Sequence, residues 1–127
     1  MFRLLLIAAG GAVGAVLRYG VGGVVHRAGG GSFPVGTLTV NLIGCIVIGL
    51  LGGLFAGPHV IREEYRLFVM VGLLGAFTTF STYGLETFGL INERQYALAA
   101  LNVTLSNVIG LAAVWIGYRL SQSWFGV

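Results

Sequence analysis

The chain has 127 residues, of which 57% are hydrophobic and 9% are charged, and its formal net charge is +3. Because a soluble domain normally carries about a quarter charged residues, this composition excludes a water-soluble globular protein and favours one embedded in lipid. The positive charge comes from single, scattered arginines with no basic run, which argues against a nucleic-acid-binding surface.

Hydrophobic segments follow one another along the whole chain. A bilayer core is crossed by about 20 helical residues, so we expect transmembrane helices at about 4–26, 36–57, 67–91 and 96–119. Together they predict an all-α membrane protein in which residues 1–127 form a single domain of four transmembrane helices. The first segment also resembles a secretory signal peptide, but an uncleaved first helix explains the later segments as well.

Small residues recur four positions apart in the first two segments, as Gly10 with Gly14 and as Gly49 with Gly53. In lipid this spacing lets helix backbones approach closely. It predicts helix packing and indicates nothing specific about transport.

Arg18 is the deepest cation of the first segment. It has two interpretations: it draws anions into a vestibule, or it extends to lipid headgroups or pairs structurally, as arginines near helix ends commonly do.

The second segment carries an amide that is out of place in hydrocarbon. Asn41 lies four residues after Thr37, so the two share one helix face. A buried asparagine costs several kcal/mol unless it is hydrogen-bonded. Asn41 therefore either bridges helices or donates a hydrogen bond to something in a pore.

The third segment contains the densest polar cluster. Residues 75–84 read Gly-Ala-Phe-Thr-Thr-Phe-Ser-Thr-Tyr-Gly, with four hydroxyl side chains within five positions. Successive helical residues turn about 100°, so these hydroxyls cannot share one face. We expect the helix to break here in mid-membrane, which is tolerated where the backbone is buried in protein or lines a wet cavity. The alternative is a kink that neighbouring helices satisfy.

Two aromatic residues and one carboxylate accompany this cluster. Phe80 and Tyr83 present ring edges with positive partial charge, along which an anion can pass; by themselves they would be ordinary core residues. Glu86 lies one turn further and is a functional candidate by its depth. In an anion channel it must lie outside the narrow path or pair with an arginine.

The fourth segment repeats the pattern. Asn102 and Ser106 lie four apart and Gly110 continues that face, while Thr104 and Asn107 lie off it. Three segments thus bring neutral hydrogen-bonding groups to mid-depth. A proton relay would be expected to show buried carboxylates or histidines, whereas hydroxyls and amides suit the replacement of an anion's hydration shell.

The arginines give only a weak orientation signal. With four crossings both termini lie on one side, which carries Arg3, Arg62, Arg66 and Arg119. The other side carries Arg27 and Arg94, with Arg18 nearer to it. Since positive loops normally fix the cytoplasmic side, so small a bias predicts insertion in both orientations. Dual topology in turn permits an antiparallel homodimer.

Three motifs, in order and at matching spacing, make the chain similar to the Fluc/CrcB fluoride channels over essentially its whole length. They read Gly-Ala-Val-Gly-Ala-Val-Leu-Arg-Tyr (11–19), Gly-Thr-Leu-Thr-Val-Asn-Leu-Ile-Gly (36–44) and Gly-Leu-Leu-Gly-Ala-Phe-Thr-Thr-Phe-Ser-Thr-Tyr (72–83). The third motif is the most specific of them.

The resemblance implies an antiparallel homodimer with two pores, which lets fluoride leave the cell passively through a bacterial inner membrane. It also implies a structural sodium ion at the dimer centre, held by the backbone carbonyls of Gly75 and Thr78 from each subunit. No chemical reaction is catalysed, so the chain is not expected to be an enzyme.

The same resemblance suggests roles for the remaining polar and aromatic residues. Asn41 matches the pore asparagine, Phe80 the first path-lining aromatic and Ser106 a hydroxyl of the fourth helix. We expect them to replace fluoride's water together with the hydroxyls of the break, which include Thr79 and Thr82. Two departures leave roles open: Tyr83 stands where the family usually has phenylalanine, and Asn102 stands where it has an aromatic residue.

Two other functions are compatible with the same sequence. Small dual-topology exporters coupled to protons share this size, and Glu86 is the one carboxylate here that such a mechanism would use. A non-transporting assembly subunit is the other alternative, in which the small residues only pack helices.

Overall fold

The computed structural model describes residues 1–57 and 62–125, the last of them by its backbone only. In this part of the chain there are four helices long and apolar enough to cross a membrane, and no strand. They are Phe2–Gly29, Val35–Ala56, Glu63–Asn92 and Tyr96–Trp124.

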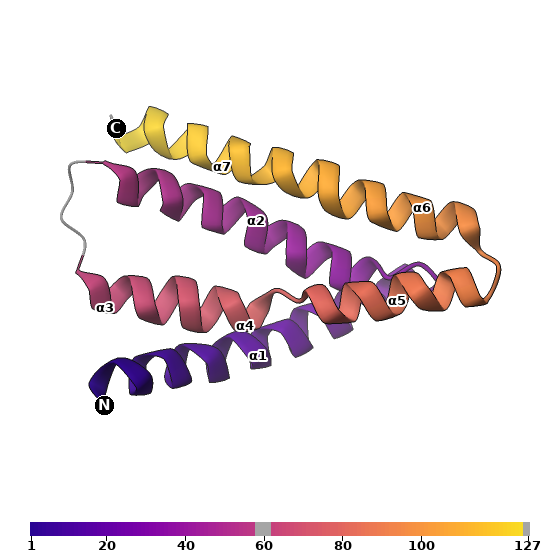
Figure 1. Cartoon of the computed structure of the whole chain (residues 1–127), viewed down its shortest axis with the longest axis horizontal. Coiled ribbons are helices and arrows are strands. Elements are labelled where there is room, and N and C mark those ends of the chain that lie inside the picture. The colour runs from indigo at the N-terminus through magenta and orange to yellow at the C-terminus, as the bar shows by residue number, and fades with distance from the viewer. Residues whose placement is uncertain (58–61, 126–127) are drawn as a thin grey trace.

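The helices run alternately up and down, so that the start of α1 and the end of α7 lie at the same end of the bundle (Figure 1). α1 (Phe2–Gly29) ends at Gly30, whose left-handed backbone (φ 60°) turns its N–H back to the His26 carbonyl. Such a cap favours glycine because it has no Cβ. α2 (Val35–Ala56) then begins directly after Pro34.

The third membrane helix is interrupted. It begins with α3 (Glu63–Arg66), widens into the π-helical stretch η1 (Leu67–Leu74) and ends as α4 (Gly75–Phe77). The helix resumes as α5 (Phe80–Asn92), and Figure 1 shows the extended link between the two halves.

The fourth helix is continuous but irregular. α6 (Tyr96–Thr104) passes through a second π-helical stretch, η2 (Leu105–Ile109), into α7 (Gly110–Phe125). In a π-helical turn the hydrogen bonds join residues five apart, and such turns occur frequently at functional sites.

Glycines bring the helix backbones together, as their spacing predicts. A side chain at Gly14 would collide with the Leu73 carbonyl, and one at Gly49 would collide with the Val114 carbonyl. Gly10 and Gly53 face neighbouring helices in the same way. The predicted packing glycines are thereby confirmed, and they join α1 to the third helix and α2 to α7.

The outer surface is rich in large apolar side chains. Those exposed along α5 and α7 include Leu85, Phe88, Leu111 and Trp115. So many exposed apolar side chains are unfavourable in water and are covered by lipid or by another protein. With four helices of membrane-spanning length, it indicates a multi-pass membrane protein.

Candidate functional site

The break in the third helix consists of two residues with extended backbone. Thr78 has φ −86° and ψ 160°, and Thr79 has φ −152° and ψ 119°. The sequence predicts an interruption in this cluster, and the structure has one; its depth in a bilayer stays a prediction.

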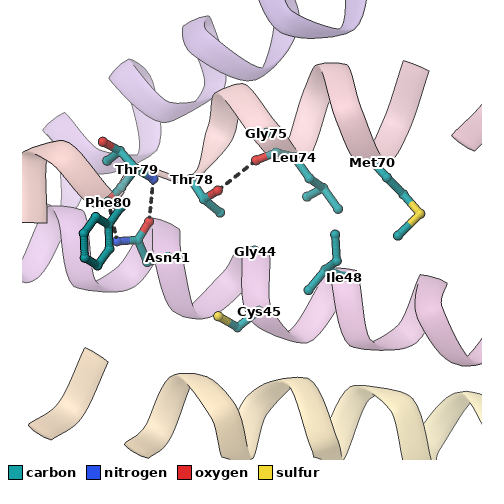
Figure 2. Close-up of a pocket in the computed structure, with 10 residues that line it drawn as sticks. All are labelled: Asn41, Gly44, Cys45, Ile48, Met70, Leu74, Gly75, Thr78, Thr79 and Phe80. Atoms are coloured by element: carbon teal, nitrogen blue, oxygen red, sulfur yellow. Dashed lines mark hydrogen bonds between the residues drawn. The ribbon is translucent and has the colours of Figure 1, made fainter. Parts of the chain in front are cut away.

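Asn41 is bound to the backbone of the break through both ends of its amide. Thr79 N–H donates to Asn41 Oδ1 over 2.8 Å, and Asn41 Nδ2 donates to the Thr79 carbonyl over 3.0 Å (Figure 2). In a continuous helix the Thr79 N–H would instead donate to the Gly75 carbonyl. Of the two interpretations open for Asn41, helix bridging is therefore observed. An amide nitrogen carries two hydrogens, and within residues 1–57 and 62–125 the second hydrogen of Asn41 Nδ2 meets no acceptor.

The hydroxyl of Thr79 caps the second half-helix. Its Oγ1 accepts a hydrogen bond from the Thr82 N–H over 3.2 Å and donates to Thr82 Oγ1 over 3.0 Å. The N-terminal end of a helix carries a positive partial charge. The break thus places the predicted residues Thr79 and Thr82 together at an end of α5 that favours negative charge.

The carbonyl of Thr78 faces the first helix. Arg18 Nη1 donates to it over 3.4 Å, and the Thr78 hydroxyl donates to the Leu74 carbonyl over 3.0 Å. Arg18 also lines a hollow of about 470 Å³, together with Thr79 and Thr82. Arg18 is thus half-buried beside the break, and the hollow is consistent with the predicted vestibule.

Glu86 lies in the same hollow and is hydrogen-bonded to Thr37. The Thr37 hydroxyl donates to Glu86 Oε1 over 2.7 Å, whereas Oε2 is buried without a hydrogen-bond partner. Within the described residues no arginine forms an ion pair with it. Thr37 and Asn41, which share a face of α2, thus bind Glu86 of α5 and Thr79 at its N-cap, two helical turns apart.

The two predicted aromatic residues lie at the start of α5. The rings of Phe80 and Tyr83 have centroids 5.4 Å apart and planes tilted by 51°. Phe80 is 81% exposed on the single chain, which leaves its ring edge free to meet another molecule. Tyr83 is half-buried, and its hydroxyl oxygen accepts a hydrogen bond from Asn107 Nδ2 over 3.2 Å.

Ser106 and Asn102 occupy different surroundings. Asn102 is 1% exposed and donates to the Thr87 hydroxyl, which in turn donates to the Tyr83 carbonyl. The Ser106 hydroxyl is buried without a hydrogen-bond partner in the described chain. Ser106 lines neither the hollow beside Arg18 nor a second hollow, described below, that Asn41 and Gly75 line. A single chain therefore does not bring Ser106 to the break.

The two residues predicted to hold a metal line a second hollow, of about 310 Å³ (Figure 2). Gly75 and Thr78 both line it, and the Gly75 carbonyl is released by the turn of the Thr79 N–H toward Asn41. Carbonyl oxygens are ligands for hard cations, and no group of His, Cys, Asp or Glu suited to another metal occurs in the described residues. Backbone carbonyls are the kind of donor that a hard cation such as sodium binds, and one of the two, that of Thr78, also accepts a hydrogen bond from Arg18.

Two contacts to α5 escape the sequence pattern. Asn107 donates to the Tyr83 hydroxyl and Asn102 donates to the Thr87 hydroxyl, and neither Asn107 nor Thr87 belongs to a predicted site. In a regular helix Asn102 and Asn107 would point about 140° apart. The wide turn of η2 between them reduces that angle, and both side chains reach α5. The spacing of residues in the sequence is interpreted with the constant turn of an α-helix, and it does not reveal a π-helical turn.

Comparisons with known proteins agree on one family. The model of the family described as "CrcB-like protein, Camphor Resistance (CrcB)" matches residues 5–118. The "Fluoride-specific ion channel FluC" of Maridesulfovibrio salexigens is 45% identical over 122 residues, which cover 96% of this chain and 97% of that one. The protein of the same name from Helicobacter pylori strain HPAG1 is 45% identical over 128 residues, covering 99% and 98%. That from Methylobacillus flagellatus is 42% identical over 121 residues, covering 94% of each chain.

Proposed function

The chain belongs to the CrcB-like family, and from this premise we propose that it is a fluoride-specific ion channel. It lets fluoride leave the cytoplasm down its electrochemical gradient through the bacterial inner membrane and so lowers the internal concentration. It is not an enzyme, and its residues replace the water of the ion instead of reacting with it.

The observation that carries this proposal is the chemistry of the break. Asn41 brings the second hydrogen of its amide there, and Thr82 brings a hydroxyl hydrogen at the positive end of α5, since the Thr79 hydroxyl donates its own hydrogen to Thr82 Oγ1. These groups are neutral, so they bind an anion without adding a fixed positive charge that would trap it. Fluoride holds its water tightly, and hydrogen-bond donors preplaced by the backbone offset the loss of that water.

The aromatic rings extend the path away from the break. Phe80 and Tyr83 lie side by side, and their edges carry positive partial charge. In the dimer Ser106 continues the path as a hydroxyl whose partner is the passing ion, since the described chain gives it none.

The pore is completed by a second, inverted copy. Phe80 is exposed and the hollow beside Gly75 and Thr78 opens at the break, so a single chain leaves its polar centre without cover. An antiparallel homodimer of dual-topology chains covers this surface twice and frames two equivalent paths. Lipid surrounds the remaining apolar faces.

Sodium is the structural cation of this dimer. The Gly75 and Thr78 carbonyls of both subunits hold it, and it offsets the negative ends of the two α4 segments where they converge. Arg18 binds the same Thr78 carbonyl from the side of α1, and the second lone pair of that oxygen serves the cation.

Fluoride efflux from liposomes that contain only the purified protein tests the function directly. We expect efflux that a fluoride electrode records without any partner protein; its absence would exclude a channel and favour the assembly subunit.

In the same assay Phe80→Ile is expected to cut the flux sharply, because it replaces a ring edge by an aliphatic group. Its dimer, measured by gel filtration, should stay intact, and an undiminished flux would remove the ring-edge path.

The second candidate is a small dual-topology exporter coupled to protons. The buried, unpaired Oε2 of Glu86 in the vestibular hollow favours it. Glu86→Gln separates the two functions, because glutamine keeps an oxygen for the Thr37 hydroxyl but cannot release a proton. A channel keeps substantial fluoride flux after this change, whereas a proton-coupled exporter loses transport.

A further inference from the structure

Asn107 is fixed in a known orientation by a neighbour that can only accept. Its Nδ2 donates to the Val103 carbonyl over 2.8 Å and to the Tyr83 hydroxyl oxygen over 3.2 Å. A carbonyl has no hydrogen to give, so the atom that faces Val103 must be the nitrogen of the amide. Both hydrogens of that nitrogen are therefore used, one for Val103 and one for Tyr83.

This orientation decides the direction of the bond to Tyr83. The phenol oxygen accepts from Asn107, so the hydrogen of the phenol is left free to donate. In the part of the chain that the structure describes, no acceptor receives it. The centroid of the Tyr83 ring lies 5.4 Å from that of Phe80, so the ring that carries this donor packs beside the aromatic residue exposed at the break.

The backbone of Tyr83 is held by Asn102, which lies in the same membrane helix as Asn107. Asn102 donates to the Thr87 hydroxyl over 2.9 Å, and that hydroxyl donates to the Tyr83 carbonyl over 2.7 Å. The two asparagines thus secure both ends of the tyrosine, which they reach because η2 widens the helix between them. The phenol is oriented by its surroundings before any ion arrives.

We infer that Tyr83 is a hydrogen-bond donor to the permeating anion and that Asn107 is the positioning residue that aims it. The inference rests on the proposed fluoride channel and assigns the anion a specific O–H group beyond the break. A hydroxyl that donates to an anion forms a shorter and stronger bond than one between neutral groups. Fluoride, the strongest acceptor among the halides, gains most from it, so the pair contributes to selectivity as well as to flux.

The experiment is a double-mutant cycle on fluoride efflux from liposomes. Tyr83→Phe removes one oxygen and keeps the ring, and we expect the flux to fall about tenfold, the size of one hydrogen bond to a charged group. Asn107→Leu removes the aiming amide and should lower the flux several-fold. The double variant should be no slower than Tyr83→Phe alone, because Asn107 acts through the hydroxyl.

A purely structural Asn107 gives a different result. If Asn107 only joined the helices, Asn107→Leu would lower the flux by the same factor in the Tyr83→Phe variant as in the unmodified chain. That result would overturn the inference. Thr104→Val is the matched control, since among the described residues this hydroxyl of the same membrane helix bonds to the Ala100 carbonyl alone; its flux should equal that of the unmodified chain.

The outcomes also separate this inference from the proposed function. An unmodified chain without fluoride flux contradicts the channel itself. A conducting chain whose Tyr83→Phe variant conducts equally well, and prefers fluoride over chloride to the same degree, overturns only the donor role. Should Asn107→Leu fail to assemble, the Tyr83→Phe measurement still decides whether the hydroxyl contributes.

Discussion

Asn41 takes the place of a missing turn of helix. Its amide supplies the acceptor for the Thr79 N–H and the donor for the Thr79 carbonyl, which a continuous helix would have supplied from the backbone. One side chain thereby allows the chain to leave the helix without stranding buried polar groups. Asn41 also lies on the proposed fluoride path, so the same amide stabilises the break and binds the passing ion.

Replacing Asn41 by leucine is expected to damage stability and flux together. Thr79 would lose both partners, and each unsatisfied backbone group costs about 1–3 kcal/mol. We expect a lower midpoint of thermal unfolding in detergent and little fluoride efflux. Asn41→Asp is the informative comparison, since it keeps the acceptor for the Thr79 N–H but brings a negative charge. The Asn41→Asp variant should unfold at a higher temperature than Asn41→Leu and still conduct poorly. If the two variants unfolded at the same temperature, the bonds between Asn41 and the Thr79 backbone would not stabilise the break.

At the scale of the element, α5 is a half-helix that needs its own beginning. The Thr79 hydroxyl provides it by accepting the Thr82 N–H. Thr79→Val keeps the branched shape and removes the oxygen, so we expect a loss of about 1 kcal/mol, the usual value of an N-cap, and a lower fluoride flux. Differential scanning fluorimetry in detergent and efflux measure the two effects.

Thr82→Ala is the control for the cap. It removes a hydroxyl from the same turn but leaves the Thr82 N–H to bond to Thr79. We expect its unfolding midpoint to lie closer to that of the unmodified chain than the midpoint of Thr79→Val. The reverse order would mean that the Thr79 hydroxyl does not begin the helix.

Local spacing predicts some of these elements and not others. The crowding of hydroxyls from Thr78 onward predicts the interruption, because a regular helix cannot place them all on one face. The glycine pairs likewise predict which helices touch, since only a residue without Cβ permits that approach. Asn107 escapes prediction because the helical wheel assumes a constant turn and η2 departs from it. The Thr37 bond to Glu86 is also missed, as it joins residues 49 positions apart.

At the scale of the whole molecule, arginines occur at both ends of the bundle, with a small excess at the end that bears the two termini. The start of α1 and the end of α7 lie at one end of the bundle (Figure 1), and by the order of the helices this end carries Arg3, Arg62, Arg66 and Arg119, whereas the other carries Arg27 and Arg94. The positive charge that would anchor one end in the cytoplasm is therefore weak, and an antiparallel dimer needs both orientations in equal amounts.

Labelling of single cysteines measures these orientations. In a Cys45→Ala background, Ser123→Cys marks the end that bears the termini, and Gly31→Cys marks the opposite end. An impermeant maleimide added to intact spheroplasts should label roughly half of each variant, since a chain with little charge bias inserts both ways. Full labelling after lysis of the cells serves as the control for reactivity. If one variant were labelled almost completely and the other hardly at all, every chain would face the same way, and no inverted partner would be present to cover Phe80 or to supply the second pair of carbonyls.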